Sequence, residues 1–189
     1  MRNFNQYIEN VDLSQLRQFF EKYGVFRQMK KKEFFASQNG NPLYMGYVER
    51  GVFRYSRIDT QGREHILGYA FQNEYIGDYA SCLRQMPLLV TIQAVTDASV
   101  YVLPFETMYS FWETNLKTQR LGRIVTEELF IQTYERMISL HCETAEERYM
   151  SLIKQCPEIL NILTLKEIAL YLSVTPETVS HIRKKMLNR

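Results

Sequence analysis

The sequence predicts an α+β protein in which an antiparallel barrel or sandwich of short strands is followed by a long helix and then by short helices. Three observations support this fold class. Strand-like runs separated by turn residues occupy residues 26–104, an uninterrupted helical pattern covers residues 116–141, and two helix-start signals stand in residues 164–189. The chain has 189 residues, of which 46% are hydrophobic, so it is long enough to bury a sizeable core.

The first 26 residues predict one amphipathic helix. Asp12 opens the apolar pattern and Gly24 closes it. The apolar positions are Leu13, Leu16, Phe19, Phe20 and Tyr23. Because no ligand-binding pattern stands in this segment, we expect the helix to pack as a lid on the domain that follows.

Residues 26–104 read as short strands at a spacing of roughly ten residues, which is typical of an antiparallel barrel or sandwich. The strand-like runs are 34–36, 44–58, 65–71, 74–79, 89–95 and 99–103. Turn-forming residues separate them, and we expect positive φ angles at Gly40, Gly51, Gly62 and Gly77. The 13 tyrosines and 11 phenylalanines favour a sheet-rich structure or an aromatic-lined pocket.

Residues 116–141 predict a single long helix with an apolar stripe at heptad spacing. The stripe consists of Leu121, Ile124, Ile131, Tyr134 and Ile138, and it is interrupted by Glu128 and Glu135. Such a stripe has two explanations: the helix packs on its own β-domain, or it pairs with the same helix of a second copy.

A shorter helix is expected next, because Thr144 and Glu147 have the spacing of a capping box, in which each residue satisfies a backbone N–H of the other. Pro157 ends this helix after Cys156. The bend at residues 141–144 is therefore the expected hinge between the long helix and the C-terminal helices.

Two helix starts stand in residues 164–189. Thr164 and Glu167 form another capping box, and Thr175 precedes Pro176, a hydroxyl cap followed by proline at the first helical position. The first helix is expected to end near residue 172 and the second near residue 187. The segment holds five basic and two acidic residues, so the positive charge of the chain is concentrated here.

Two short helices joined by a turn of about three residues form a helix-turn-helix pattern, whose second helix lies in the major groove of DNA. Candidate base-reading residues are Glu177, Ser180 and His181. Candidate contacts to the DNA backbone are Thr164, Lys166, Thr175, Thr178, Arg183, Lys184 and Lys185. The alternative is an ordinary helical hairpin that closes a domain and carries a solvated basic end.

The run TLKEIALYLSVTPETVSHIRKKM resembles the DNA-binding helix pair of the Crp/Fnr family of bacterial regulators. The segment from Met45 to Phe71 is similar to the second to fourth strands of that family's sensor domain, a β-roll of the jelly-roll kind. The resemblance implies a β-roll sensor domain at residues 1–115, a dimerisation helix at 116–141 and a helix-turn-helix domain at 142–189. It also implies a homodimer on a palindromic operator, and RNA polymerase as a partner if the protein is an activator.

The cyclic-nucleotide pocket of the family is only partly matched. Family members use a Phe-Gly-Glu run for the ribose and a later arginine, followed by a hydroxyl residue, for the phosphate. Gly77 and Asp78 match the first part, whereas Leu88 and Leu89 stand in place of the second. Arg84 lies four residues earlier and is expected to face solvent. A phosphate buried without its guanidinium is costly, so we expect no binding of cyclic AMP in the family's manner.

A second hypothesis is that the pocket is an aromatic cavity that binds an uncharged or cationic effector. Its candidate lining residues are Tyr69, Phe71, Tyr75, Gly77, Asp78, Tyr79 and Gln93. The alternative is an interior filled by side chains. A DNA-binding or scaffold protein without any effector, whose pocket is vestigial, is therefore a competing function.

Other classes of protein are disfavoured. No run approaches the roughly 20 apolar residues of a membrane span and the N-terminus lacks an apolar signal region, so a cytoplasmic protein is the expectation. The three cysteines, none before residue 82, show no metal-binding spacing, so no metal, iron–sulfur cluster, haem or other cofactor is expected. A cupin-like metalloenzyme needs several histidines in the β-region, where only His65 stands, beside Glu64, so no enzymatic activity is expected. Many relatives continue past the second helix into a wing, and we expect weaker DNA affinity from a chain that stops two residues after Leu187.

Overall fold

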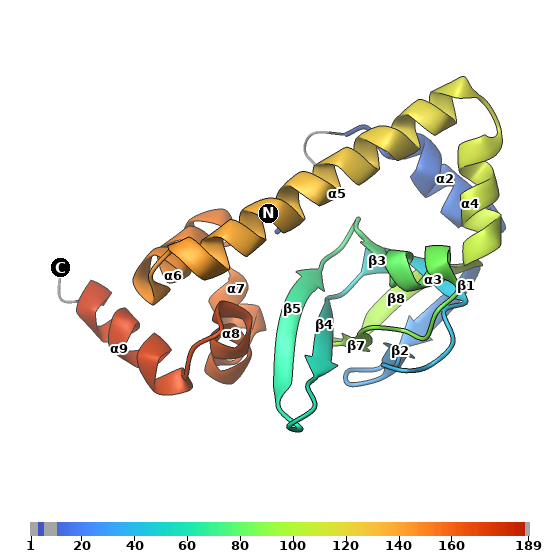
Figure 1. Cartoon of the computed structure of the whole chain (residues 1–189). Helices are drawn as coiled ribbons and strands as arrows, with labels where there is room; N and C mark the ends of the chain where they lie inside the picture. Colours follow the sequence, from blue (N-terminus) through green and yellow to red (C-terminus); the bar gives the residue numbers. More distant parts are fainter. Residues whose placement is uncertain (1–3, 6–10, 188–189) are drawn as a thin grey trace.

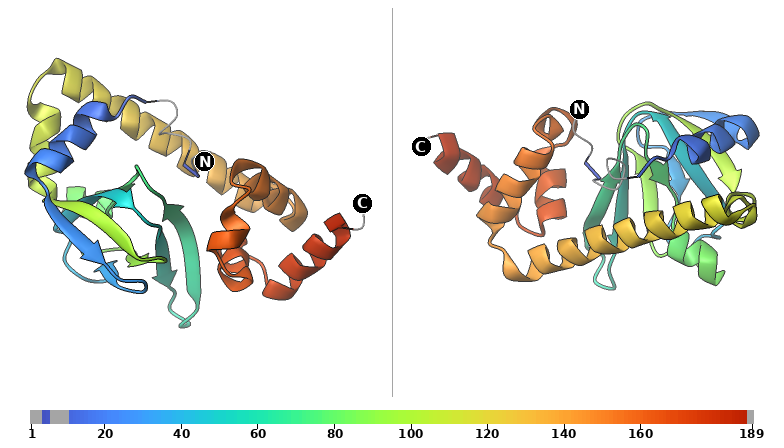
Figure 2. Two further views of the ribbon diagram at one scale, coloured as in Figure 1. Left: turned by 180° about the vertical axis from the view of Figure 1, so that it is seen from behind. Right: turned by 90° about the horizontal axis from the view of Figure 1, so that it is seen from above.

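The computed structural model describes residues 4–5 and 11–187 of the chain, without the side chain of Leu187. A domain of two β-sheets lies at one end of the molecule and a group of short helices lies at the other, and one long helix runs along both (Figure 1). Figure 2 shows that the short C-terminal helices gather beneath the end of the long helix, next to one sheet of the β-domain. The α+β fold class predicted from the sequence is confirmed.

Each of the two sheets has four antiparallel strands, in the orders β1-β8-β3-β6 and β2-β7-β4-β5. The first sheet consists of β1 (Val25–Met29), β8 (Ala98–Pro104), β3 (Tyr44–Arg50) and β6 (Tyr75–Ile76). The second consists of β2 (Phe34–Ala36), β7 (Thr91–Ala94), β4 (Phe53–Ile58) and β5 (Glu64–Ala70). These two sheets are called the β-roll below.

Alternation along the strands decides which side chains face the inside of the β-roll. The interior cluster is small and aliphatic in the main, and consists of Met29, Val48, Phe53, Ala70, Ile76, Ile92, Ala94, Ala98 and Val100. Ala70 belongs to this cluster, whereas its neighbours Tyr69 and Phe71 belong to a different one, on the outer side of β5. The interior of the β-roll is thus filled by side chains from both sheets.

The predicted turns are largely where they were expected. Gly51 has φ +103° between β3 and β4, where a Cβ atom would lie 2.6 Å from the Cβ of Ala98, so glycine is required there. Gly62 and Gly77 also have positive φ. The expectation for Gly40 was wrong, because its neighbour Asn39 takes the left-handed conformation instead, at φ +66°.

Three helices cover the β-roll: α2 (Ser14–Tyr23), α3 (Tyr79–Arg84) and α4 (Phe105–Glu113). The amphipathic helix predicted near the N-terminus is α2, and its Phe20 is fully buried. The strand-like run 74–79 was interpreted too broadly. Only Tyr75–Ile76 is strand, because the side chain of Asp78 accepts a hydrogen bond from the backbone of Ser81 and starts α3.

The long helix α5 runs from Leu116 to Cys142, one residue beyond its predicted end. Asn115 caps its first turn. The following residue, Glu143, is extended, and Thr144 forms the predicted capping box with Glu147. The chain therefore bends at the predicted hinge.

The C-terminal helices are α6 (Ala145–Gln155), α7 (Ile159–Ile162), α8 (Leu165–Leu172) and α9 (Pro176–Leu187). Their core is continuous with the outer side of β5, since Tyr69 and Phe71 pack in one cluster with Tyr149, Leu152 and Ile168. No helix in the described part of the chain is both long and apolar enough to cross a bilayer.

Candidate nucleic-acid interface and effector cavity

The helices α8 and α9 have the predicted helix-turn-helix geometry. The hydroxyl of Thr164 accepts from the backbone N–H of Glu167, whose carboxylate accepts in return from the backbone N–H of Thr164 at 2.9 Å. Ser173 ends α8 in the left-handed conformation. At the next start, the backbone N–H of Thr178 donates to the hydroxyl of Thr175 at 3.3 Å. The local sequence thus fixes both helix starts and the turn between them.

The face of α9 that carries Glu177 and His181 is exposed. Val179 and Ile182 are buried on the opposite face, and Ser180 is half-buried between the two. The N–H of its own backbone and the hydroxyl of Thr175 hold the pKa of Glu177 below its usual range. Glu177 is therefore an ionised acceptor at the helix start, the form that accepts a hydrogen bond from a cytosine amino group.

The seven candidate backbone contacts differ in their accessibility. Lys166 and Lys184 are exposed and Arg183 is half-buried. Lys185 instead pairs with Glu146 of α6, with 2.5 Å between its Nζ and the carboxylate. The hydroxyl of Thr164 donates to Glu167, so the capping box already uses it. The remaining two, Thr175 and Thr178, share a hydrogen bond between their hydroxyls.

The seven residues predicted to line an effector pocket do not converge. Tyr69 and Phe71 pack on the C-terminal helices, whereas Tyr75 and Tyr79 pack in a cluster with α2 and α4. Gln93 lies on the outer side of β7, and its side chain accepts from Arg54 and donates to the carbonyl of Lys32. The structure agrees with the alternative of an interior filled by side chains.

Gly77 and Asp78 are engaged within the protein. The backbone N–H of Gly77 donates to the hydroxyl of Tyr55 at 3.3 Å, and that hydroxyl donates to the carbonyl of Tyr75. Burial raises the pKa of Tyr55 far above its usual value. The carboxylate of Asp78 accepts from the hydroxyl of Ser81 and from the backbone N–H of Leu89, each at 2.7 Å. Tyr55 was missed from the sequence because a single tyrosine in a strand carries no local signal.

Titration of the protein with cyclic AMP is expected to give no binding heat at millimolar concentrations. The side chain of Leu88 is buried where the family places its phosphate-binding arginine, and Arg84 is exposed, as predicted. Isothermal titration calorimetry checks this expectation. A dissociation constant in the micromolar range would contradict it.

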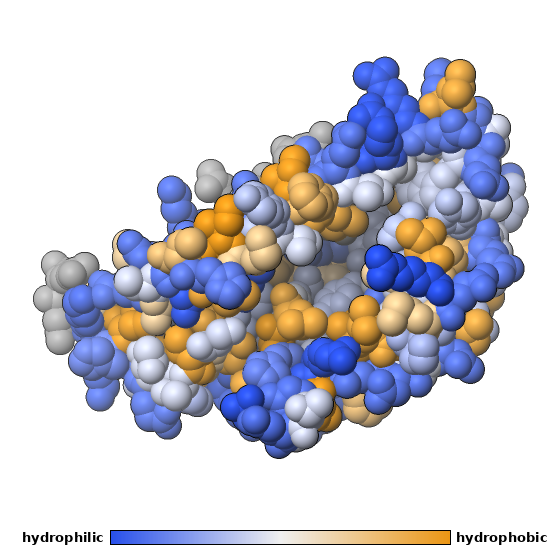
Figure 3. All heavy atoms as spheres, viewed as in Figure 1, coloured by the Kyte–Doolittle hydropathy of each residue, from blue (hydrophilic) through white to orange (hydrophobic). Residues whose placement is uncertain are grey.

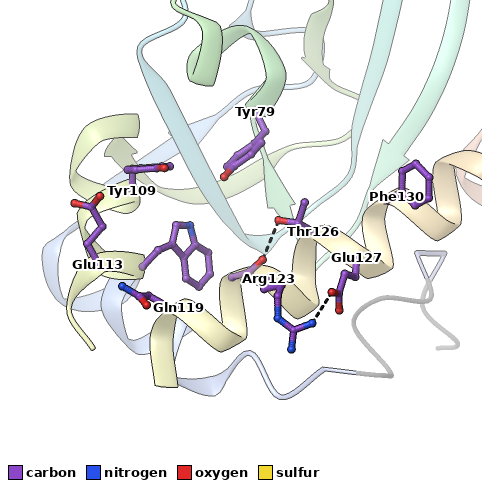
Figure 4. Close-up of a pocket in the computed structure, with 10 residues that line it drawn as sticks. Tyr79, Tyr109, Glu113, Gln119, Arg123, Thr126, Glu127 and Phe130 are labelled. Carbon is purple, nitrogen blue, oxygen red and sulfur yellow. Dashed lines mark hydrogen bonds and ion pairs between the residues drawn. The ribbon is translucent and has the colours of Figure 1, made fainter. Parts of the chain in front are cut away.

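A cavity of about 640 Å³ lies between α3, α4 and the first half of α5 (Figure 4). Aromatic rings make up much of its wall, from Tyr79, Tyr109, Trp112 and Phe130. The guanidinium of Arg123 pairs with Glu127 along its rim. In Figure 3 the surface is hollowed between α5 and the β-roll. Of the seven predicted pocket residues, only Tyr79 lines this cavity.

The predicted dimer stripe on α5 divides into two parts. Leu121 and Ile124 pack against the cluster beneath α2 and α4, in the same chain. Ile131, Tyr134 and Ile138 are exposed, together with Phe130 and Met137. Figure 3 shows apolar side chains along the visible face of α5. The first half of α5 therefore belongs to its own β-roll, and the second half presents a free apolar face.

Comparisons with known proteins agree with this architecture. Residues 26–115 match the cyclic nucleotide-binding domain family. FixK2 from Bradyrhizobium japonicum is 20% identical, with a TM-score of 0.74 over 87% of this chain and 85% of its own. The c-di-GMP responsive global regulator CLP of Xanthomonas campestris is 14% identical, with a TM-score of 0.72 over 94% of this chain and 92% of its own. No curated protein matches the chain.

A third structure, from Eubacterium rectale, is described as a transcriptional regulator of the Crp/Fnr family. It is 17% identical, with a TM-score of 0.71 over 97% of this chain and 87% of its own. The architecture that the chain shares with these structures combines a β-roll of the cyclic nucleotide-binding kind, a long helix and a group of short C-terminal helices. The chain has the fold of the Crp/Fnr regulators, and the fold that the sequence resemblance implied is confirmed.

Proposed function

We propose that the chain is a cytoplasmic, homodimeric transcription regulator that binds a palindromic DNA operator through α9. The observation that carries this proposal is the face of α9 on which Glu177 and His181 are exposed, while Val179 and Ile182 are buried on the opposite face. A helix held in this way is able to enter a major groove with its first turn against the base edges. Nothing in such a mechanism requires catalysis, and we propose no enzymatic activity.

The second half of α5 is the proposed dimer interface. Its exposed apolar residues are Phe130, Ile131, Tyr134, Met137 and Ile138. Pairing of two copies about a two-fold axis covers this face and places the two α9 helices about one turn of DNA, roughly 34 Å, apart. The operator then has two inverted half-sites. An activator of this kind also contacts RNA polymerase.

A second candidate function, effector-independent DNA binding, is favoured by one observation. The hydroxyl of Tyr55 accepts the hydrogen bond from the backbone N–H of Gly77, and side chains fill the interior of the β-roll. Little room is left where the Crp/Fnr family has its effector pocket. The metalloenzyme alternative has no comparable support, because His65 is exposed near the start of β5 and its Nε2 bonds to Asp59, just after the end of β4.

The test is selection of DNA from a random pool by the purified protein at two salt concentrations, followed by sequencing. We expect an enriched palindrome, and we expect affinity to fall steeply as salt rises, because lysines and arginines release counterions from phosphate. Glu177→Ala is expected to relax the base preference at one position of each half-site, a change of about 1–3 kcal/mol in discrimination. Glu106→Ala, which removes an exposed acidic side chain from α4, is the matched control and should leave the palindrome unchanged.

Failure of the wild-type protein to enrich any sequence would contradict DNA recognition by α9. An enriched sequence without inverted symmetry would contradict the two-fold dimer but leave DNA recognition intact. A palindrome that stays equally sharp with Glu177→Ala would remove Glu177 from the base-reading residues.

A further inference from the structure

A second cavity, of about 620 Å³, lies where the three parts of the molecule meet. Its walls come from β5, the second half of α5, α6, the end of α8 and the N-terminal residues Phe4 and Asn5. Figure 1 shows the C-terminal helices near both the end of α5 and β5, the elements that supply these walls. Its volume falls in the range of sites for small metabolites.

Two arginines give the cavity its chemistry. Arg136 of α5 stacks on the ring of Tyr171, with 3.9 Å between the guanidinium carbon and the ring centre, and donates to the carbonyl of Tyr171. Arg148 of α6 donates to the carbonyls of Leu172 and Glu143. Tyr171 and Leu172 are the last residues of α8, so both arginines bind the negative end of that helix.

These guanidiniums have spare donors, and the carboxylate of Glu143 acts on Arg136 only through its charge, without an ion pair within 4.0 Å among the described residues. Each presents five N–H groups, and the described residues supply acceptors for one N–H of Arg136 and two of Arg148. Neither forms an ion pair within 4.0 Å in the part of the chain that the structure describes. Glu143 also lines the cavity, but its carboxylate accepts from the hydroxyl of Ser139. Glu135, the other acidic lining residue, is exposed.

The same face of α5 that carries Arg136 supplies an unused acceptor one turn earlier, at Gln132. The amide of Gln132 donates to Asn5 at 2.5 Å, and its Oε1 is buried without a hydrogen-bond partner among the described residues. Leaving a buried acceptor unsatisfied costs about 1–3 kcal/mol, so a ligand that donates to this oxygen recovers that loss. Asn5 in turn donates to the buried carboxylate of Glu74, which holds this part of the wall in place.

We propose that this cavity binds a small organic anion that also carries a hydroxyl or amino donor, with its anionic group on Arg136 and Arg148 and its donor on Gln132. Charge-assisted bonds to planar guanidiniums favour carboxylate or phosphate oxygens. The aromatic rings of Phe4 and Tyr171 flank the remaining volume. This site is distinct from the interior of the β-roll and from the cavity beside Trp112.

Occupancy of the site acts on the DNA-binding helices by direct contact. The anion competes with the end of α8 for the same two guanidiniums, and it touches α5, α6 and the N-terminal segment at once. A bound ligand is therefore able to change how α8 and α9 sit against α5 without entering the β-roll.

The probes are inorganic phosphate, which has the charge alone, and glycerol 3-phosphate, which adds hydroxyl donors; glycerol is the uncharged control. Calorimetric titration of the full-length protein at constant ionic strength is expected to show one saturable site per chain. Glycerol 3-phosphate is expected to bind at least fivefold more tightly than phosphate, and glycerol is expected not to bind. No DNA is present, so the result is independent of the operator selection.

Arg136→Gln is expected to weaken glycerol 3-phosphate binding at least tenfold, whereas Arg120→Gln, at an exposed position of the same helix, should not change it. Since Arg136→Gln also removes a contact to α8, Ser151→Trp provides a second variant, which fills the cavity from α6 and keeps both arginines. Loss of binding in both variants supports the site. Absence of saturable binding by the wild-type protein, or equal binding by Arg136→Gln, would overturn the proposal.

Discussion

Tyr134→Glu is expected to convert the proposed dimer into a monomer at micromolar concentration. The Tyr134 side chain is half-exposed at the centre of the apolar face of α5, and its ring stacks with Phe130 at 6.1 Å between centres. Gln132 and Arg136 contact other parts of the same chain. Tyr134 is two residues from each of them, a rotation of about 200° around the helix axis, so its side chain points to nearly the opposite side of α5. Two-fold pairing would bury two facing carboxylates with no basic partner between them, which is strongly unfavourable.

The effect on DNA binding is expected to be larger than that of any base-reading residue. Loss of the second α9 removes the gain from two linked sites, roughly 10²- to 10⁴-fold in affinity. Sedimentation velocity measures the monomer, and a fluorescence anisotropy titration with the selected operator measures the affinity.

Leu140→Glu is the matched control for this change. Leu140 is on the same helix and also partly exposed, but six residues, about 120° around the helix, separate it from Tyr134. This variant should remain a dimer. A Tyr134→Glu protein that sediments as a dimer would exclude the second half of α5 as the interface.

Stability is expected to fall as the pH rises from about 5 to about 9, because of Glu74. This carboxyl is fully buried and accepts from the backbone N–H of Phe71 at 3.1 Å and from Asn5. Burial raises its pKa to about 8, and the hydrogen bonds from Asn5 and Phe71 offset only part of that rise. The folded protein therefore holds the proton more tightly than the unfolded chain, whose pKa at this position is near 4.5.

The sign follows from proton linkage. The stabilising contribution of protonated Glu74 is complete below pH 4.5 and is lost as the pH rises through 8. The shift corresponds to roughly 3–5 kcal/mol in the free energy of unfolding. Urea unfolding of the wild-type protein and of Glu74→Gln at several pH values isolates the contribution of Glu74 to the free energy of unfolding.

Relative to Glu74→Gln, the wild-type protein is expected to lose roughly 3–5 kcal/mol between pH 5 and pH 9, because glutamine stays neutral throughout. Glu113→Gln, at an exposed position of α4, is the control and should follow the wild type at every pH. A constant difference between wild type and Glu74→Gln would show that this carboxyl titrates near its ordinary pKa.

Three of the helix starts could be predicted because each depends on residues close together in the sequence. The capping boxes of Thr144 and Thr164 and the Thr175–Pro176 start are all present in the structure. The strand positions also follow from alternation and turn residues. β1 was not expected, because its VFRQM run has four exposed positions out of five and no alternating apolar pattern.

The residues predicted to line a pocket do not form one site. The reason is that side chains alternate between the two faces of a strand, and the sequence does not show which face is inside. Alternation places the side chains of Tyr69 and Phe71 on one side of the strand and that of Ala70 on the other. Large aromatic residues were expected within the β-roll. In the structure Ala70 faces the interior, and the rings of Tyr69 and Phe71 pack against the C-terminal helices.

Contacts between distant segments were also beyond local reasoning. The cavity at the junction depends on Asn5, Arg136 and Arg148, which belong to three separate segments, and no local spacing rule connects these segments. The side chain of Arg54 lies 3.9 Å from Glu167, so a residue predicted only as a helix cap also faces the β-roll. Such pairs become visible only when the chain is folded.

The core that joins β5 to the C-terminal helices has a consequence for how the protein melts. Tyr69 and Phe71 on the sheet and Tyr149, Leu152 and Ile168 on the helices belong to one cluster, so neither side keeps a complete core without the other. Heating should give a single cooperative transition rather than separate melting of the β-roll and the C-terminal helices. A fragment that contains only residues 144–189 would expose to solvent the apolar surface that β5 normally covers, and it would be prone to self-association.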